Sequence, residues 1–253
     1  MSEPVASTAR MVTMVRVGIV AALLIAWEAL ARSGLLFRDV VPSLEAIGRA
    51  VFRLLVAPEL YANLGVTLAE IGISLVIGGL SGLAVGILLG ANRFLSRAYE
   101  SLVYYLGPTP KIIFFPVMIM WFGVGSGSKI AMGAISCFFP IAISAASGMR
   151  QIDRVLIRVG MSFRATTWQM VTKIYLPAMR EPVVNGIRLG LGVAIIGTVL
   201  AQTKLSNRGL GYLIIQAYST FDMPRMYALL IVLFILAVGA NTLIGRLSHS
   251  RRR

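Results

Sequence analysis

Long apolar runs alternate with shorter polar segments along the whole chain. Each run has about the 20 residues that a helix needs to cross the hydrocarbon core of a bilayer. The pattern predicts about six membrane-spanning helices. They fall at 12–31, 67–90, 102–122, 130–149, 184–202 and 227–245. We therefore predict an all-α integral membrane protein in which residues 1–253 form a single transmembrane domain.

The first run allows a second interpretation as a signal peptide. A basic start, an apolar middle and the triplet Ala29-Leu30-Ala31 are typical of a cleaved segment. Trp27 and Glu28 immediately before the triplet favour a retained helix instead. The order of the remaining spans is the same in both cases.

A polar segment at 150–183 interrupts the runs and contains two predicted helices. In the first helix, one face is apolar and a second face carries arginines four residues apart. The apolar face comprises Ile152, Val155, Leu156, Val159 and Phe163, and the arginines are Arg150, Arg154 and Arg158. A folded helix pair between two spans indicates an element that docks onto a partner.

The second helix of this segment has clear start and stop signals. Thr166 and Gln169 make a T-x-x-Q capping box, and Trp168 follows the cap on one side of the helix. Pro177 disfavours helical backbone at the preceding residue, so we predict that this helix ends at Leu176.

Composition and charge agree with a membrane protein. Hydrophobic residues make up 57% of the chain and the mean hydropathy is +0.82, which excludes an ordinary soluble domain. The net charge of +14 follows from topology, because 14 of the 24 cationic residues fall in predicted cytoplasmic segments and eight in outer ones. This count takes six spans with the N-terminus inside, which puts the C-terminus inside as well, and the bias then favours a cytoplasmic 150–183 segment. No basic patch interleaved with aromatic residues indicates nucleic acid as a partner.

No catalytic motif or metal-ligand set is present in the sequence. Cys137 lies alone in an apolar span, as a packing residue would, and His249 is the single histidine. The segment Gly123–Lys129 departs from the phosphate-binding loop pattern, and we interpret it as a short outer turn. We expect no cofactor and no enzyme activity. If the chain is a transporter, it has no ATP site of its own and must use an ion gradient or a separate ATPase.

The second span carries a regular series of small residues. Gly78, Gly82, Gly86 and Gly90 recur every four residues and form one flat face of the helix. Such a face lets a neighbouring helix approach closely, so we predict helix packing there. Glu70 lies near the start of the same span, where it could pair with a cation, cap a helix or lie at the outer membrane interface, which we favour.

The third span is predicted to be broken by prolines. Pro108 and Pro110 lie near its inner end, and Pro116 lies in its middle. Broken helices are tolerated at membrane depth where they line a cavity or are buried in protein. Lys111 lies among these prolines. It either extends to the inner interface or faces a transport pathway as a cation.

Several motifs together resemble the permease subunits of binding-protein-dependent ABC importers, in the branch that carries nitrate, sulfonates and taurine. The resemblance covers about residues 40–250. It rests on Leu106–Pro116, Trp121–Gly125, Phe138–Pro140, Thr167–Gln169, Leu176–Pro177, Gly186–Leu189 and Gly209–Leu213, in this order and spacing. Each motif alone would be a weak signal.

The resemblance implies that the 150–183 segment is the cytoplasmic loop whose coupling helix enters a groove on the ATPase. In the family this loop carries an E-A-A signature, a glycine four residues later and a Leu-Pro near its end. Here the signature positions are Arg158, Val159 and Gly160, and the glycine position is Arg164. Leu176 and Pro177 match the family pattern. The change from an acidic to a basic residue at 158 opens the question of altered coupling.

The resemblance also implies the partners and the mechanism. The permease would lie in the lipid of the inner membrane as a homodimer or as a pair with a related permease. It would work with two ATPase subunits and with a substrate-binding protein outside the cytoplasm. ATP would bind one state of the assembly more tightly and so switch access to the pathway. The solute would be small and anionic, such as a sulfonate, taurine or nitrate. The alternative is a secondary transporter or channel that needs no ATPase.

Overall fold

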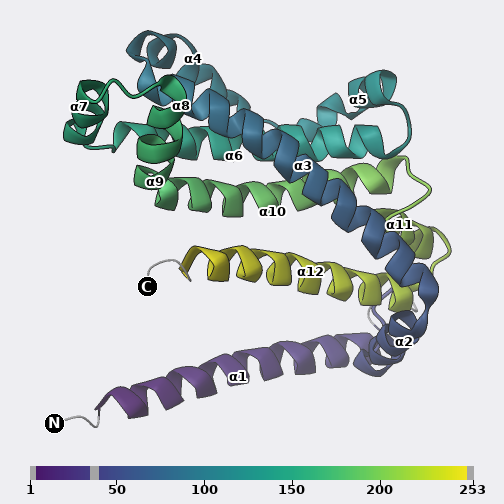
Figure 1. Ribbon diagram of the computed structural model, residues 1–253. Coiled ribbons are helices and arrows are strands. Elements are labelled where there is room, and N and C mark those ends of the chain that lie inside the picture. The colour runs from purple at the N-terminus through teal and green to yellow at the C-terminus, as the bar shows by residue number, and fades with distance from the viewer. Residues whose placement is uncertain (1–3, 35–39, 250–253) are drawn as a thin grey trace. The chain divides into compact units, whose positions relative to one another are not determined.

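The computed structural model describes residues 4–34 and 40–249, and within them the backbone is helical with short connecting turns and no strand (Figure 1). The side chain of His249 lies outside the described residues. The α-helices are α1 (Pro4–Arg32), α2 (Leu44–Val56), α3 (Pro58–Ala91), α4 (Arg93–Leu106), α5 (Phe115–Phe122), α6 (Ser126–Arg150), α7 (Arg154–Ser162), α8 (Thr167–Gln169), α9 (Leu176–Ala178), α10 (Arg180–Lys204), α11 (Leu210–Ser219) and α12 (Met223–His249). A 3₁₀ turn, η1 (Lys111–Phe114), and a π-helical segment, η2 (Met170–Tyr175), complete the chain. The predicted all-α fold is confirmed.

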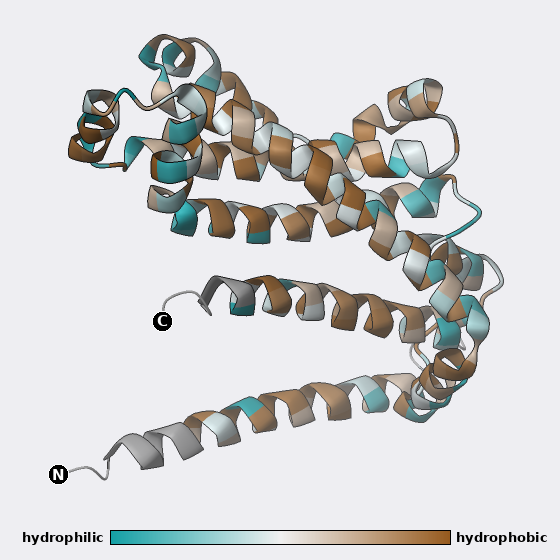
Figure 2. Ribbon diagram, viewed as in Figure 1, coloured by the Kyte–Doolittle hydropathy of each residue, from teal (hydrophilic) through white to brown (hydrophobic). Residues whose placement is uncertain are grey.

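Five of the described helices are long and apolar enough to cross a bilayer. They are Met11–Arg32, Pro58–Ala91, Ser126–Arg150, Arg180–Lys204 and Met223–Arg246. Figure 2 shows hydrophobic residues along most of their length. Each helix begins before the apolar run that predicts it or ends after it, because the hydrogen-bonded helix extends into polar residues that hydropathy excludes.

The sixth candidate span is bent. Helix α4 and the segment Lys111–Phe122 meet at an angle of 93°. Pro108 and Pro110 lie in the break and cannot donate backbone hydrogen bonds, so the prediction of a broken span is confirmed. The position of Pro116 was predicted wrongly. It lies in the first turn of α5 rather than in the middle of a helix, where its missing N–H has no helical partner to lose.

The chain folds into two compact units. The first comprises Met1–Leu60 and Ile214–Val232. In this unit the indole Nε1 of Trp27 donates to Pro42 O at 3.1 Å, and its ring meets Tyr227 edge-on at 5.3 Å. Glu28 accepts from Leu44 N at 2.9 Å. The last turn of α1 therefore contacts both the segment before α2 and the start of α12.

The second unit comprises Tyr61–Leu213 and Leu233–Arg253, and its central element is α6. Helix α3 covers one side of α6 and α10 covers another (Figure 1). Cys137 and Ile141 of α6 form a buried cluster with Ala194 of α10. Gly190 of α10 faces Ile141, where an added Cβ would lie 2.7 Å from the Cδ1 atom. Small residues therefore set close approach on both sides of α6.

Candidate functional site

The helix pair in the 150–183 segment exposes much of its apolar surface. Only Ile152 from the predicted apolar face is buried, in a cluster with Met149 and Met179. Val155, Leu156, Val159, Met161 and Phe163 are all exposed. Trp168 is 75% exposed and Phe163 83% exposed. Exposed apolar surfaces of this kind are typical of regions that contact another protein or the membrane.

Helix α7 ends in a Schellman motif that depends on Arg164. The N–H of Arg164 donates to Met161 O at 2.9 Å, and the N–H of Ala165 donates to Gly160 O at 3.0 Å. Arg164 has φ of +50°, in the left-handed region that favours glycine. The resemblance aligns Arg164 with the glycine of the family signature. The left-handed turn in this chain therefore carries a cationic side chain.

Gly160 lies at the closest approach between α7 and η2. A Cβ at this position would lie 2.6 Å from Met170 Sδ and would also collide with Ile174 Cδ1. The resemblance aligns Gly160 with the last alanine of the E-A-A signature, but the Cβ of an alanine would require Met170 or Ile174 to move, so the close approach here depends on glycine. Arg158 lies on the exposed face of α7 and has no acidic partner among the described residues.

The predicted capping box at the start of α8 is present. Thr166 N donates to Gln169 Oε1 at 2.8 Å, and Gln169 N donates to Thr166 Oγ1 at 3.3 Å. The predicted end of the helix at Leu176 is wrong, because helical backbone continues through Pro177 to Ala178. The π-helical turns of η2 precede Leu176, and Pro177 then lies in the first turn of α9, where proline is tolerated.

The prolines and Lys111 meet at the break between α4 and α5. The ammonium of Lys111 donates to Gly107 O, the residue that follows α4, and lies 5.1 Å from the centre of the Phe139 ring. A cation at the carboxyl end of a helix satisfies free carbonyl groups there. Lys111 is half-buried, whereas Pro108, Pro110 and Pro116 are exposed. The structure thus brings Lys111 against the broken backbone and the α6 aromatic ring.

A buried polar network in unit 2 was missed from the sequence. Glu70 is only 3% exposed, and Gln202 Nε2 donates to its carboxylate at 2.7 Å, so its side chain is buried against neighbouring helices. Helix α3 begins at Pro58, which places Glu70 more than three turns inside it. Gln202 also donates to Thr67 Oγ1 at 3.1 Å. The network therefore joins α3 to the end of α10.

Lys129 supplies positive charge next to this network. We predicted it in an outer turn, yet it lies in the first turns of α6 and is fully buried. Its ammonium donates to Val124 O, and its charge interacts electrostatically with Glu70. The turn at Gly123–Gly125 ends sooner than predicted because α6 begins at Ser126. A glutamate, a lysine and a glutamine in or next to apolar runs were the signal that could have indicated this network.

The same network holds the start of α11 in place. Three backbone N–H groups there donate to side chains of α3 and α10: Gly209 N to Asn63 Oδ1 at 2.7 Å, Leu210 N to Thr67 Oγ1 at 2.8 Å, and Gly211 N to Gln202 Oε1 at 2.9 Å. These donors are the free groups that begin a helix. One of the motifs that carry the family resemblance, Gly209–Leu213, is thus fixed by side chains from α3 and α10.

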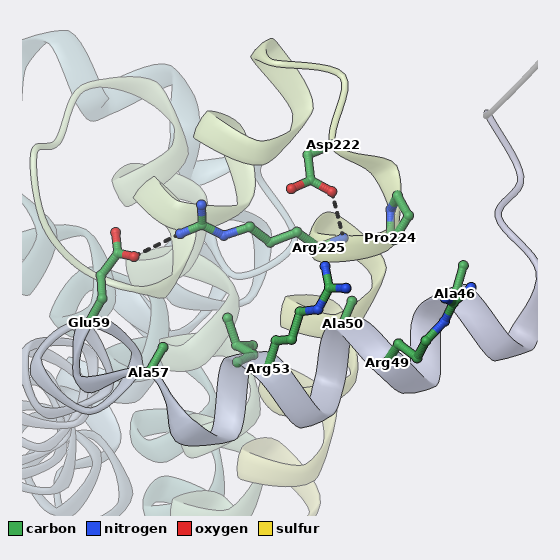
Figure 3. Close-up of a pocket in the computed structure, with 10 residues that line it drawn as sticks. Ala46, Arg49, Ala50, Arg53, Ala57, Glu59, Asp222, Pro224 and Arg225 are labelled. Atoms are coloured by element: carbon green, nitrogen blue, oxygen red, sulfur yellow. Dashed lines mark hydrogen bonds and ion pairs between the residues drawn. The ribbon is translucent and has the colours of Figure 1, made fainter.

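Unit 1 contains a cationic cleft of about 440 Å³ between α2 and the start of α12 (Figure 3). Arg49 and Arg53 line it from α2, and Arg225 lines it from the first turn of α12. Arg225 pairs with Glu59 at 2.9 Å, whereas Arg53 has no acidic partner among the described residues. The cleft therefore has positive charge available for an acidic group. Sequence reasoning counted these arginines only as topology signals.

The five long apolar helices and the bent helix pair define the chain as a membrane protein with several spans. The chain belongs to the family of binding-protein-dependent transport system inner membrane components, whose family model matches residues 82–253. It is accordingly a multi-pass inner membrane protein and the permease of an ABC importer. This membership argues against a secondary transporter or channel.

Named relatives cover most of the chain. The probable ABC transporter permease protein of Haemophilus influenzae is 30% identical over 91% of this chain and 94% of the relative. The putative aliphatic sulfonates transport permease protein SsuC of Bacillus subtilis is 29% identical, over 81% and 75%. The taurine transport system permease protein TauC of Escherichia coli K12 is 30% identical, over 75% and 70%.

The fold is also similar to a solved structure. A chain of the MetNI methionine ABC transporter, in an inward facing conformation, superposes with a TM-score of 0.66. The match covers 83% of this chain and 98% of that chain at 23% identity. The similarity concerns the fold, which the two chains share over most of their length.

Proposed function

We propose that this permease works as a dimer on two ATPase subunits, which contact the 150–183 segment from the cytoplasm, and that it imports a small organic or inorganic anion. The observation that carries the proposal is the exposed apolar surface of α7 and α8, supported by the Schellman motif at Arg164 and the capping box at Thr166. A rigid helix pair with an apolar face is suited to transmit movement between subunits.

The topology in this proposal places both termini in the cytoplasm. The charge bias of the sequence supports it, because most cationic residues flank the ends of spans on the same side as the 150–183 segment. In this arrangement the ATPase supplies hydrolysis and the permease supplies the pathway. Closure of the ATPase pair on ATP would favour one of two states of the helix bundle, to the extent that ATP binds that state more tightly.

A substrate-binding protein is the expected partner on the opposite side. The cleft formed by Arg49, Arg53 and Arg225 then faces outward, since α2 precedes and α11 follows the outer ends of spans in this topology. Its unpaired cationic charge suits an acidic side chain of a binding protein. Charge complementarity at such a surface raises the association rate more than the final affinity.

The names of the relatives support an anionic substrate. Two of them are named for aliphatic sulfonates and taurine, compounds that carry a sulfonate group. Other relatives are named for formylaminopyrimidine and riboflavin, so the family model alone does not define the substrate. Lys111 adds a single cation at the break between α4 and α5, where an anion could pass.

The proposal is tested by purification and uptake. The tagged permease should co-purify with an ATPase encoded beside it, in a ratio of two to two by native mass spectrometry. Cells that express the system should accumulate labelled taurine or an alkanesulfonate, and uptake should stop when the ATPase is inactivated. Purification of the permease without any ATPase, from cells in which uptake proceeds, would contradict the coupling role. Uptake of only neutral solutes would contradict the anion assignment.

A further inference from the structure

A second arginine-rich cleft, of about 540 Å³, lies in unit 2 where several helices end or begin. Arg93 and Arg97 line it from the start of α4, Arg150 from the end of α6, and Arg154 from the start of α7. Tyr175 of η2 completes the wall on the side of the helix pair. Neither the family model nor the names of the relatives assign a role to this cleft.

The cleft holds more positive charge than the protein neutralises. Arg150 pairs with Glu100 at 2.7 Å. Within the described part of the chain, Arg93, Arg97 and Arg154 have no acidic partner. The nearest acid in sequence to Arg154 is Asp153, which caps α7 by accepting from Val155 N at 2.8 Å. Several guanidinium groups around one cavity favour an anion that accepts several hydrogen bonds.

The position of the cleft indicates a membrane-bound anion. The candidate spans α3 and α6 end beside it, at Ala91 and Arg150. Helices α3 and α6 run in the same direction and pack closely, since a Cβ at Gly90 would lie 2.8 Å from Ala146 O. Their ends therefore lie side by side. The ends of two spans mark the level of the lipid headgroups, where phosphates lie.

Helix α4 adds apolar surface next to the charges. Phe94 is 75% exposed and lies between the two arginines that α4 contributes, and Tyr99 and Leu102 are also exposed on this helix. A helix that combines cationic side chains with exposed aromatic residues is typical of the membrane interface. A free phosphate ion would use the arginines alone, whereas a phospholipid would also cover Phe94.

We propose that this cleft binds the headgroup of an anionic phospholipid. The phosphate accepts hydrogen bonds from Arg93, Arg97 and Arg154, and an acyl chain passes along the exposed face of α4 at Phe94. Because Arg154 begins α7 and Tyr175 ends η2, the bound lipid contacts the base of the coupling helix pair. The proposal is independent of which solute the permease carries.

The test uses the full chain purified in detergent and native mass spectrometry with phosphatidylglycerol, phosphatidylcholine or inorganic phosphate. We expect phosphatidylglycerol to bind with defined stoichiometry and more tightly than phosphatidylcholine. The double variant Arg93→Gln/Arg97→Gln should weaken that binding about 25-fold, since each arginine near an anionic surface contributes a factor of about five. Equal binding of both lipids, or unchanged binding to the double variant, would overturn the proposal.

Two further variants keep the test specific. Glu100→Gln removes the acid that neutralises Arg150, so it should tighten binding of phosphatidylglycerol, a gain that damaged folding would not produce. Arg49→Gln/Arg53→Gln removes two arginines from the separate cleft in unit 1 and should leave lipid binding unchanged. If inorganic phosphate at millimolar concentration displaces the lipid completely, the cleft is a soluble-anion site and the lipid assignment is wrong.

Discussion

Gln202 Nε2 donates a hydrogen bond of 2.7 Å to the carboxylate of Glu70, between residues 132 positions apart in the sequence. Both side chains are almost completely buried, and Gln202 also accepts from the first turn of α11. The pair thus connects α3, α10 and α11 in unit 2. When one partner is removed, the other remains buried without a hydrogen bond and its desolvation lowers the stability of the fold.

This pair should be thermodynamically coupled. Glu70→Leu or Gln202→Leu should each lower the free energy of unfolding by about 1–3 kcal/mol, because each leaves a buried polar group unpaired. The double variant should lose less than the sum of the two single variants. The measurement is thermal unfolding of the purified permease in detergent. Glu45→Gln, which alters an exposed glutamate, is the matched control and should have little effect. Simple additivity would show that the two residues act independently.

Arg164 should be replaceable by glycine with a gain in stability. Left-handed backbone costs an L-residue about 1–2 kcal/mol, and glycine does not have this cost. Because glycine loses more entropy on folding, the expected net gain of Arg164→Gly is about 0.5–1 kcal/mol. Arg158→Gly, in the interior of α7, should instead destabilise by about 1 kcal/mol. Thermal unfolding and limited proteolysis of the 150–183 segment measure both effects. A loss of stability in Arg164→Gly would contradict the assigned strain.

The glycine face of α3 provides a test within one helix. At Gly82 and Gly86 an added Cβ would lie 2.7 and 2.5 Å from the carbonyl oxygens of Phe138 and Ala142, so the double leucine variant should separate α3 from α6. We expect loss of the monodisperse peak in size-exclusion chromatography and loss of uptake. Gly72→Leu is the control in the same helix, because nothing lies within 4 Å of an added Cβ there. A stable, active Gly82→Leu/Gly86→Leu variant would exclude the packing role.

Apolar runs and small-residue spacing predicted most of this fold, because membrane helices and their close packing have local sequence signals. The polar network did not have such a signal. Glu70 lies only three residues into the predicted apolar run but is deep in α3, since the helix begins at Pro58 among polar residues. Lys129 follows three glycines that indicate a turn, and only the fold shows that α6 has already begun. Partners from distant segments decide whether such residues are buried.

The 150–183 segment was predicted only in part, because some of its features have local sequence signals and others do not. The capping box at Thr166 is a local pattern and was recognised from four residues. The left-handed turn at Arg164 was not, because arginine rarely adopts this backbone and no local rule indicates it. The continuation through Pro177 depends on the π-helical register of η2, which hydrophobic spacing does not encode.

Trp168 should be essential for coupling. It is 75% exposed within a structured helix pair, so Trp168→Asp should abolish uptake and release the ATPase while the permease remains in the membrane at normal amounts. Membrane fractionation, co-purification and uptake measure these three outcomes. Gln151→Asp, at an exposed polar position of the same segment, should retain uptake. If Trp168 instead anchors at the membrane interface, the variant would keep its ATPase and only its amount would fall.

Lys111 should influence transport through its charge. If it faces the pathway, Lys111→Gln should lower the uptake of an anionic solute about tenfold, because a hydrogen bond to a charged group contributes about 1.5–3 kcal/mol. Lys111→Glu should lower uptake further, and Lys111→Arg should retain most of it. The interactions with Gly107 O and the Phe139 ring require a second measurement, since losing them could loosen the break between α4 and α5. Thermal unfolding supplies it. Two outcomes would show that Lys111 only stabilises the helix break. In the first, uptake falls only in proportion to the amount of folded protein. In the second, Lys111→Gln and Lys111→Glu lower uptake equally.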